Sequence, residues 1–254
     1  MGSDRVEDAR PTGREDVPRI ADAFARELEN ILGENLHSAV IYGAAAFPDT
    51  LPTCDIDFHV LLHRPLTNVE RTALEAMHRA LAKRFPPLGA EMDGYYLLLA
   101  DARRSAPPQS QLWALATDES WALHRAHILA GRCLRLCGPE PSTVYLPPTW
   151  EELEAALTGE LEYVKAHLRE YPDYCILNLC RLVYSFETHD VVVSKARAAQ
   201  WALAALPDWH GAIHLAMASY EGGASEADRT SMVEKMEGLL ADARRRIDGR
   251  RTVD

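Results

Sequence analysis

The stretch Asp55-Ile56-Asp57-Phe58-His59-Val60-Leu61-Leu62 decides how this chain is interpreted, and a ten-residue spacer separates it from Gly43-Ala44. Its alternation of polar and apolar residues predicts a β-strand whose two aspartates share one face, opposite Ile56 and Phe58. Cα atoms two residues apart on a strand are about 6 to 7 Å apart. Two such carboxylates can share one hard cation such as Mg²⁺, which also binds substrate phosphates. Taken alone, the pair is more typical of a half-buried strand with two solvent-facing acids.

Composition places the chain among ordinary globular proteins. Its 254 residues are 47% apolar and 26% charged, enough for two modest domains or one large one. The net charge of -11 argues against a nucleic-acid partner and suits a small cationic acceptor. The five cysteines form no CxxC pair, and no run approaches the ~20 apolar residues of a membrane span. We therefore expect a cytoplasmic monomer with no membrane partner.

The first half alternates helical and strand patterns, which predicts an α/β (α+β) domain with a mixed sheet. One face of the third predicted strand carries Glu91, Asp93 and Tyr95. The expected elements are a helix over 17–32, strands over 37–42 and 54–62, a helix over 67–85, a strand over 91–99, a loop over 100–111, a helix over 113–129 and a strand over 132–137.

The second half is almost wholly helical. Thr149 and Glu152 form a capping box at its start, because a threonine followed three residues later by a glutamate can satisfy the first free amides of a helix. Further helices are expected over 173–186, 194–206, 210–220 and 225–246. The chain is thus divided into a flexible leader (1–16), the α/β domain (17–147) and an all-α helical-bundle domain (148–254).

The motifs together resemble known enzymes. Gly43-Ala44, a spacer, Asp55-Ile56-Asp57 and then Asp93 on a later strand resemble the nucleotidyltransferase superfamily, whose pattern is Gly-Ser, a spacer, Asp-x-Asp and a further Asp or Glu. The helical half is similar to the C-terminal domain of the streptomycin/spectinomycin adenylyltransferases, the aminoglycoside 3''-type enzymes. The segments that carry this likeness are 177–185, 194–202 and 218–220. The resemblance covers roughly residues 17 to 245.

The resemblance implies an Mg²⁺-dependent enzyme that transfers AMP from the cosubstrate ATP to a hydroxyl of an aminoglycoside-like molecule, in a cleft between the two domains. It makes Asp55, Asp57 and Asp93 the metal ligands, with Asp93 also the general base. Glu91 is the alternative third acid because it lies on the same predicted strand face as Asp93. The residues that the resemblance implies for nucleotide binding are Gly43, Ala44, Cys54, Arg181, Lys195 and Tyr220.

The chain departs from the family pattern at several of these positions. Ala44 and Cys54 stand where the family has serines, and Asp93 stands where it has a glutamate. Tyr171 and Tyr174 occupy positions that the family uses to hold streptomycin. Two alternatives therefore stay open: a nucleotide-binding or regulatory module that catalyses no transfer, and transfer to a different small-molecule acceptor.

Four other aromatic or imidazole side chains are also candidates for ligand contacts. Trp113 and Trp121 suit either ligand stacking or core packing. His124 and His127 have the spacing of a metal pair but lack an evident third ligand.

Overall fold

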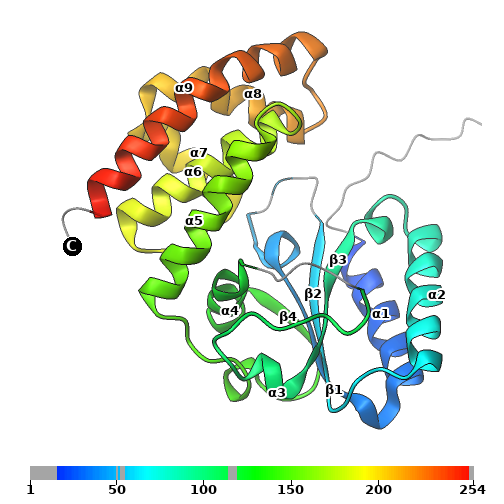
Figure 1. Ribbon diagram of the computed structural model, residues 1–254. Helices are drawn as coiled ribbons and strands as arrows, with labels where there is room; N and C mark the ends of the chain where they lie inside the picture. The colour runs from blue at the N-terminus through cyan, green and yellow to red at the C-terminus, as the bar shows by residue number, and fades with distance from the viewer. Residues whose placement is uncertain (1–15, 50, 52–54, 114–118, 252–254) are drawn as a thin grey trace, which may run out of the picture.

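The computed structural model describes residues 16–49, 51, 55–113 and 119–251, which form an α/β part followed by a helical region (Figure 1). The α/β part contains β1 (Leu36–Tyr42), β2 (Ile56–Leu62), β3 (Met92–Leu98), β4 (Cys133–Cys137), α1 (Val17–Leu32), α2 (Asn68–Arg84), α3 (Leu99–Ala102) and α4 (Trp121–Leu129). The helical region contains α5 (Trp150–His167), α6 (Pro172–Thr188), α7 (Lys195–Ala205), α8 (His210–Tyr220) and α9 (Glu226–Arg251).

The four strands form one mixed sheet in the order β3-β2-β1-β4. β1 is antiparallel to both β2 and β4, whereas β2 and β3 are parallel and are connected through α2. The register sets Tyr42 opposite Asp57, and Asp57 beside Asp93. The predicted fold class, a mixed-sheet α/β domain followed by a helical domain, is confirmed.

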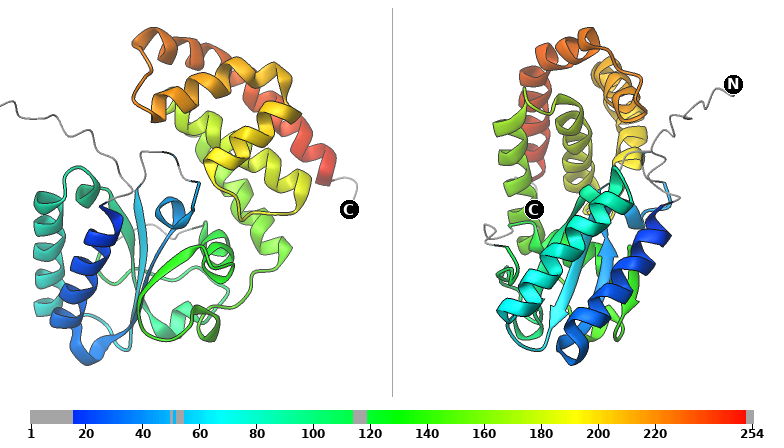
Figure 2. Two further views of the ribbon diagram at one scale, coloured as in Figure 1. Left: turned by 180° about the vertical axis from the view of Figure 1, so that it is seen from behind. Right: turned by 90° about the vertical axis from the view of Figure 1, so that its right-hand side faces the viewer.

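The two faces of the sheet are covered by different helices (Figures 1 and 2). Phe58 on β2 packs against Phe24 of α1, with ring centroids 4.9 Å apart, in a core that also includes α2. The alternate residues of β2 face α4, where His59 meets the ring of Trp121 at 5.3 Å. Because side chains alternate along a strand, Asp57 lies on the α4 face, opposite Ile56 and Phe58 as predicted.

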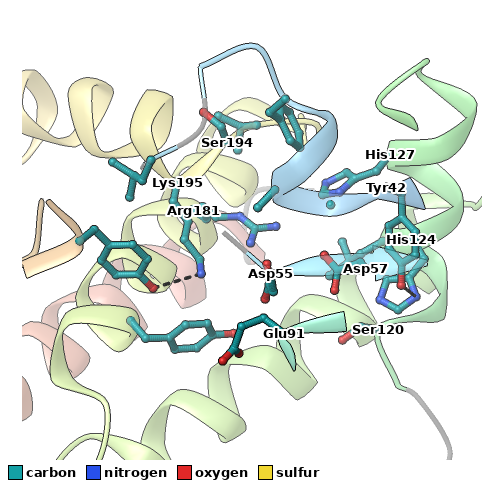
Figure 3. Close-up of a pocket in the computed structure, with 18 of the residues that line it drawn as sticks. Tyr42, Asp55, Asp57, Glu91, Ser120, His124, His127, Arg181, Ser194 and Lys195 are labelled. Carbon is teal, nitrogen blue, oxygen red and sulfur yellow. Dashed lines mark hydrogen bonds between the residues drawn. The ribbon is translucent and has the colours of Figure 1, made fainter. Parts of the chain in front are cut away.

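The helical region packs around α6. This helix contacts α5, α7, α8 and α9, and it is apolar and buried over most of its circumference, as expected for a central helix. Arg181 is one of its half-buried residues, and it faces the α/β part rather than the helical core (Figure 3).

Several element bounds match the sequence prediction. α1 and α8 have the predicted bounds, and Gly33 ends α1 with a φ of 48°. At Thr149 both hydrogen bonds of the predicted capping box are present. The predicted boundary between the two domains, after residue 147, lies just ahead of α5 and stays a prediction.

Two predictions were wrong. The loop expected over 100–111 begins with the short helix α3. The helix expected over 113–129 begins only at Trp121. Trp113 packs against His78 of α2, with ring centroids 5.0 Å apart, whereas Trp121 packs on the opposite face of the sheet. A single straight helix cannot supply both contacts, so the apolar spacing was misleading.

One buried cation ties the two parts of the chain together. Arg125 of α4 is fully buried and donates to the carbonyl oxygen of Leu146 at 3.0 Å and to a carboxylate oxygen of Glu152 on α5 at 3.0 Å. A buried guanidinium left without these partners would be costly, so the contacts hold α4 against the start of α5. Over the described ranges, no helix has the length and apolar character to cross a lipid bilayer.

Candidate active site

A cavity of about 530 Å³ lies between the α/β part and the helical region. Its two walls differ in charge: Asp55 and Asp57 point into it from β2, and Arg181 and Lys195 approach from the helical region (Figure 3). The polar or charged side chains in its lining are those of Tyr42, Asp55, Asp57, Glu91, Ser120, His124, His127, Glu160, Tyr174, Arg181, Ser194, Lys195 and Tyr220.

Gly43 brings the end of β1 against Asp57. It opens the 3-10 turn Gly43–Ala46 with a φ of 67°, a conformation that favours glycine. A Cβ added to Gly43 would lie 1.8 Å from Oδ2 of Asp57. Glycine is therefore required here for two reasons, its backbone conformation and the close carboxylate. Ala44, the next residue, also lines the cavity.

The carboxylates gather at the start of β2 and β3. Asp55 is exposed just before β2, and Asp57, two residues further along the chain, is partly buried. Asp93 is exposed and lies beside Asp57 in the parallel register. Burial raises the pKa of Asp57 well above its usual value, and the charges of Asp55 and Asp93 raise it further. Such a concentration of negative charge suits a cation.

Glu91 and Asp93 hold different positions relative to the cavity. Glu91 is exposed and lines the cavity. Asp93 does not contribute to the described lining, although it lies beside Asp57. Both acids therefore stay candidates for the third carboxylate. Among the residues that the structure describes, no group of three His, Cys, Asp or Glu side chains is arranged to hold a metal ion on its own.

Lys195 is the centre of the cationic wall. It is the first residue of α7, after the N-cap Ser194, and its Nζ donates to the hydroxyl of Tyr220 at 3.3 Å. The same nitrogen lies 4.3 Å from the ring centroid of Tyr174, which is cation–π range. Burial lowers the pKa of Lys195, while Asp55 acts in the opposite direction. Arg181 adds a second positive charge nearby.

Glu160 is a cavity residue that the sequence did not single out. It is half-buried on α5, and its two oxygens accept from Ser120 at 2.7 Å and from Asn178 at 2.9 Å. Since a carboxylate has about four acceptor positions, some acceptor capacity remains toward the cavity. Five glutamates lie on α5, and helical periodicity does not distinguish the one that faces a ligand from the surface acids.

The two histidines of α4 line the cavity but are already engaged. His124 Nδ1 lies 2.9 Å from the hydroxyl of Tyr42. His127 Nε2 lies 2.9 Å from the carbonyl oxygen of Val191 and donates to it. Burial lowers the pKa of His127 to about 3, so it stays neutral. Trp113 and Trp121 pack in the cores on either face of the sheet, outside the described lining of the cavity.

The structure thus brings together most of the residues singled out in the sequence, which are far apart along the chain. The cavity is lined by Gly43, Ala44, Asp55, Asp57, Arg181, Lys195 and Tyr220, and Asp93 lies next to Asp57. Cys54 lies outside the described residues. The chemical roles of all these residues stay predictions.

Comparison with known proteins gives two findings. The family model of the aminoglycoside adenylyltransferase C-terminal domain matches residues 148–244. The fold is similar to a crystal structure of spectinomycin adenyltransferase AAD(9) from Enterococcus faecialis with ATP and spectinomycin, with a TM-score of 0.72 and 14% sequence identity. That match covers 88% of this chain and 99% of that chain. The first finding confirms the resemblance seen in the helical half, and the second confirms the fold.

Proposed function

We propose that this chain, a nucleotidyltransferase that carries the C-terminal domain of the aminoglycoside adenylyltransferases, transfers AMP from ATP to a hydroxyl of a small, polar, cationic molecule. The observation that carries the proposal is the pairing of opposite charges across one cavity. Asp55 and Asp57 lie on one wall, and Arg181 and Lys195 lie on the other. We further expect the protein to act as a cytoplasmic monomer.

The cationic wall suits the triphosphate of ATP. Pyrophosphate leaves with additional negative charge, and fixed cations stabilise that charge as it develops. Lys195 stands at the N-terminus of α7, where the free amides of the first turn add positive potential. Tyr220 orients the Lys195 ammonium through its hydroxyl. In this proposal Gly43 and Ala44 let the backbone approach a phosphate closely.

The reaction forms one bond and breaks one. The acceptor oxygen attacks the α-phosphorus of ATP, the bond between the α-phosphorus and the bridging oxygen breaks, and pyrophosphate leaves. The acceptor proton passes to a carboxylate. Asp93 is our first candidate for this base because it stands beside Asp57 in the sheet, and Glu91 is the alternative because it lines the cavity.

Asp55 and Asp57, with Asp93 as a further ligand, would hold Mg²⁺. Burial raises the pKa of Asp57, and the charges of Asp55 and Asp93 raise it further; this crowding of carboxylates supports the assignment. The ion would neutralise charge on the triphosphate. Because Mg²⁺ keeps water and substrate oxygens among its ligands, two protein carboxylates and the phosphates are a sufficient set.

A module that binds a nucleotide without transferring it is the second candidate. It is favoured by Ala44, whose methyl group lines the cavity where related enzymes carry a serine hydroxyl. Such a module would bind ATP with Mg²⁺ yet release no pyrophosphate in the presence of any acceptor.

Pyrophosphate release separates these functions. The wild-type chain is mixed with ATP, Mg²⁺ and a panel of spectinomycin, streptomycin and other aminoglycosides. We expect release with at least one acceptor, its loss in Asp57→Asn, and a larger loss in Asp93→Asn than in Glu91→Gln. The reverse order of the last two would assign the base to Glu91. Full turnover in a folded Asp57→Asn variant would refute the proposed metal site.

A further inference from the structure

His127 of α4 is held in the cavity wall through only one of its two ring nitrogens. Nε2 donates to the carbonyl oxygen of Val191 at 2.9 Å, so Nε2 carries the proton. Burial lowers the pKa of the imidazole to about 3, which keeps the ring neutral. A neutral imidazole has one N–H, so the other nitrogen, Nδ1, bears a lone pair and acts as an acceptor.

This acceptor is open to the cavity. Among the described residues, Nδ1 of His127 has no hydrogen-bond partner. It is also not one of the fully enclosed polar atoms that lack a partner, such as Nε2 of His59. The side chain is only 6% exposed and lines the cavity, so the space that Nδ1 reaches is the cavity itself.

The walls beside His127 are apolar. Phe47 meets the imidazole edge to face, with ring centroids 5.4 Å apart. Leu123 stands four residues before His127 on α4, and Val193 stands two residues after Val191. All three apolar side chains are buried and line the cavity. Apolar walls around a single acceptor suit a heteroaromatic ring that carries one donor.

This end of the cavity adjoins the cationic wall. Val193 is two residues before Lys195, which the proposed function places against the triphosphate. Besides burial, the positive charge of Arg181 lowers the pKa of His127, so the potential here disfavours a cationic acceptor. In Figure 3, His127 and Glu91 lie on either side of the aspartates. The end near His127 therefore suits the base of the nucleotide.

We propose that His127 selects the nucleotide, because its Nδ1 accepts a hydrogen bond from the exocyclic amino group of adenine. This inference rests on the proposed function and names the residue that favours ATP over GTP. Guanine has a carbonyl oxygen, O6, where adenine has this amino group, so two acceptors would face each other. The imidazole cannot change tautomer to relieve this conflict, because Val191 holds the proton on Nε2.

The test compares three nucleotides in the absence of an acceptor. ATP, GTP and purine riboside triphosphate, which lacks the amino group, are titrated calorimetrically into the full chain with Mg²⁺. We expect ATP to bind roughly threefold to tenfold more tightly than purine riboside triphosphate, which only loses one hydrogen bond. ATP should bind about tenfold to 100-fold more tightly than GTP, which leaves two acceptors unpaired.

His127→Gln removes the acceptor and retains the contact with Val191. The glutamine amide extends about as far as Nε2 and can donate to the same carbonyl, but it has no acceptor at the place of Nδ1. Both affinity ratios should fall to about twofold or less. His78→Gln is the matched control, because Nε2 of His78 is also hydrogen-bonded, to the Tyr96 hydroxyl at 2.9 Å, and His78 lies outside the described lining of the cavity. It should keep both ratios.

Thermal unfolding shows whether each variant is folded, and the wild-type ratios test the proposal even without the variants. Equal affinity of the wild type for ATP and purine riboside triphosphate, tighter binding of GTP, or binding of none of the three would overturn it. Retention of both ratios in folded His127→Gln, or their loss in folded His78→Gln, would do the same. Failure of the proposed function is seen separately, as ATP preference without pyrophosphate release in the presence of any acceptor.

Discussion

Replacing Gly43 with alanine gives the sharpest test of the proposed site, because one added methyl group meets a carboxylate. The new Cβ would lie 1.8 Å from Oδ2 of Asp57, whereas real Cβ atoms stay at least 3.0 Å from such neighbours. The carboxylate oxygen or the turn must therefore move by at least 3.0 - 1.8 = 1.2 Å. A displacement of about 1 Å at a reacting centre can lower the rate about 10²-fold. We expect a loss of at least that size in kcat/KM.

The substitution also strains the backbone, so a matched control is needed. An alanine at positive φ costs about 1 kcal/mol, or roughly 2 to 4 °C in Tm for a protein of this size. Gly131 has a similar φ of 75°, but a Cβ there would meet no heavy atom within 4 Å. Gly131→Ala should therefore share the loss of Tm and retain activity.

The measurements are pyrophosphate release at saturating ATP and thermal unfolding of the two variants. The reasoning would be refuted if Gly43→Ala kept its activity within threefold of wild type. It would also be refuted if Gly131→Ala lost as much activity as Gly43→Ala, because backbone strain would then account for both.

Two further changes test the cationic wall and the acid stability of the fold. Lys195→Met should lower kcat/KM for ATP about tenfold to 100-fold, since charged hydrogen bonds contribute about 1.5 to 3 kcal/mol, while the exposed Lys83→Met should change it little. Equal effects of the two lysine variants would contradict the assignment. Glu70 accepts hydrogen bonds from Arg64 and Thr67, and the Arg64 contact lowers its pKa to about 2. The resulting stabilisation is present above the unfolded-state pKa near 4.3 and is lost as pH falls toward 2. Glu70→Gln should therefore lower the free energy of unfolding, measured with denaturant, by about 1 to 2 kcal/mol at pH 7. Solvent screening limits this value because Arg64 is half exposed, and the loss at pH 3 should be clearly smaller. A cost that is independent of pH would show that ionisation of Glu70 is not its source.

The sequence predicted secondary structure well where local signals agree. The helix over 17–32 has apolar residues at helical spacing and ends at a glycine, so periodicity and terminator give the same bounds. The segment from Trp113 to Leu129 lacks such agreement. Its aromatic residues pack on opposite faces of the sheet, and a tertiary contact of that kind leaves no local pattern.

The part of the site formed by residues close together in the sequence, within a recognisable motif, was predictable. Asp55 and Asp57 are neighbours on one strand, so their shared face follows from strand geometry. The contact between Gly43 and Asp57 depends on the register of β1 against β2, which sequence periodicity does not fix. Glu160 depends on how the helical region docks, and nothing local marks it among the acids of α5.

The buried Arg125 has a consequence for how ligands reach the cavity. Its hydrogen bonds join α4, Leu146 and the first turn of α5, so they span the connection between the two parts of the chain. Swinging the helical region away as a rigid body would break the bond to Glu152 and leave the buried guanidinium without its carboxylate, with only the backbone carbonyls of Ser105 and Leu146 as partners. Substrates should instead enter and leave through local rearrangements at the cavity mouth, with the two walls held at a nearly constant separation throughout the catalytic cycle.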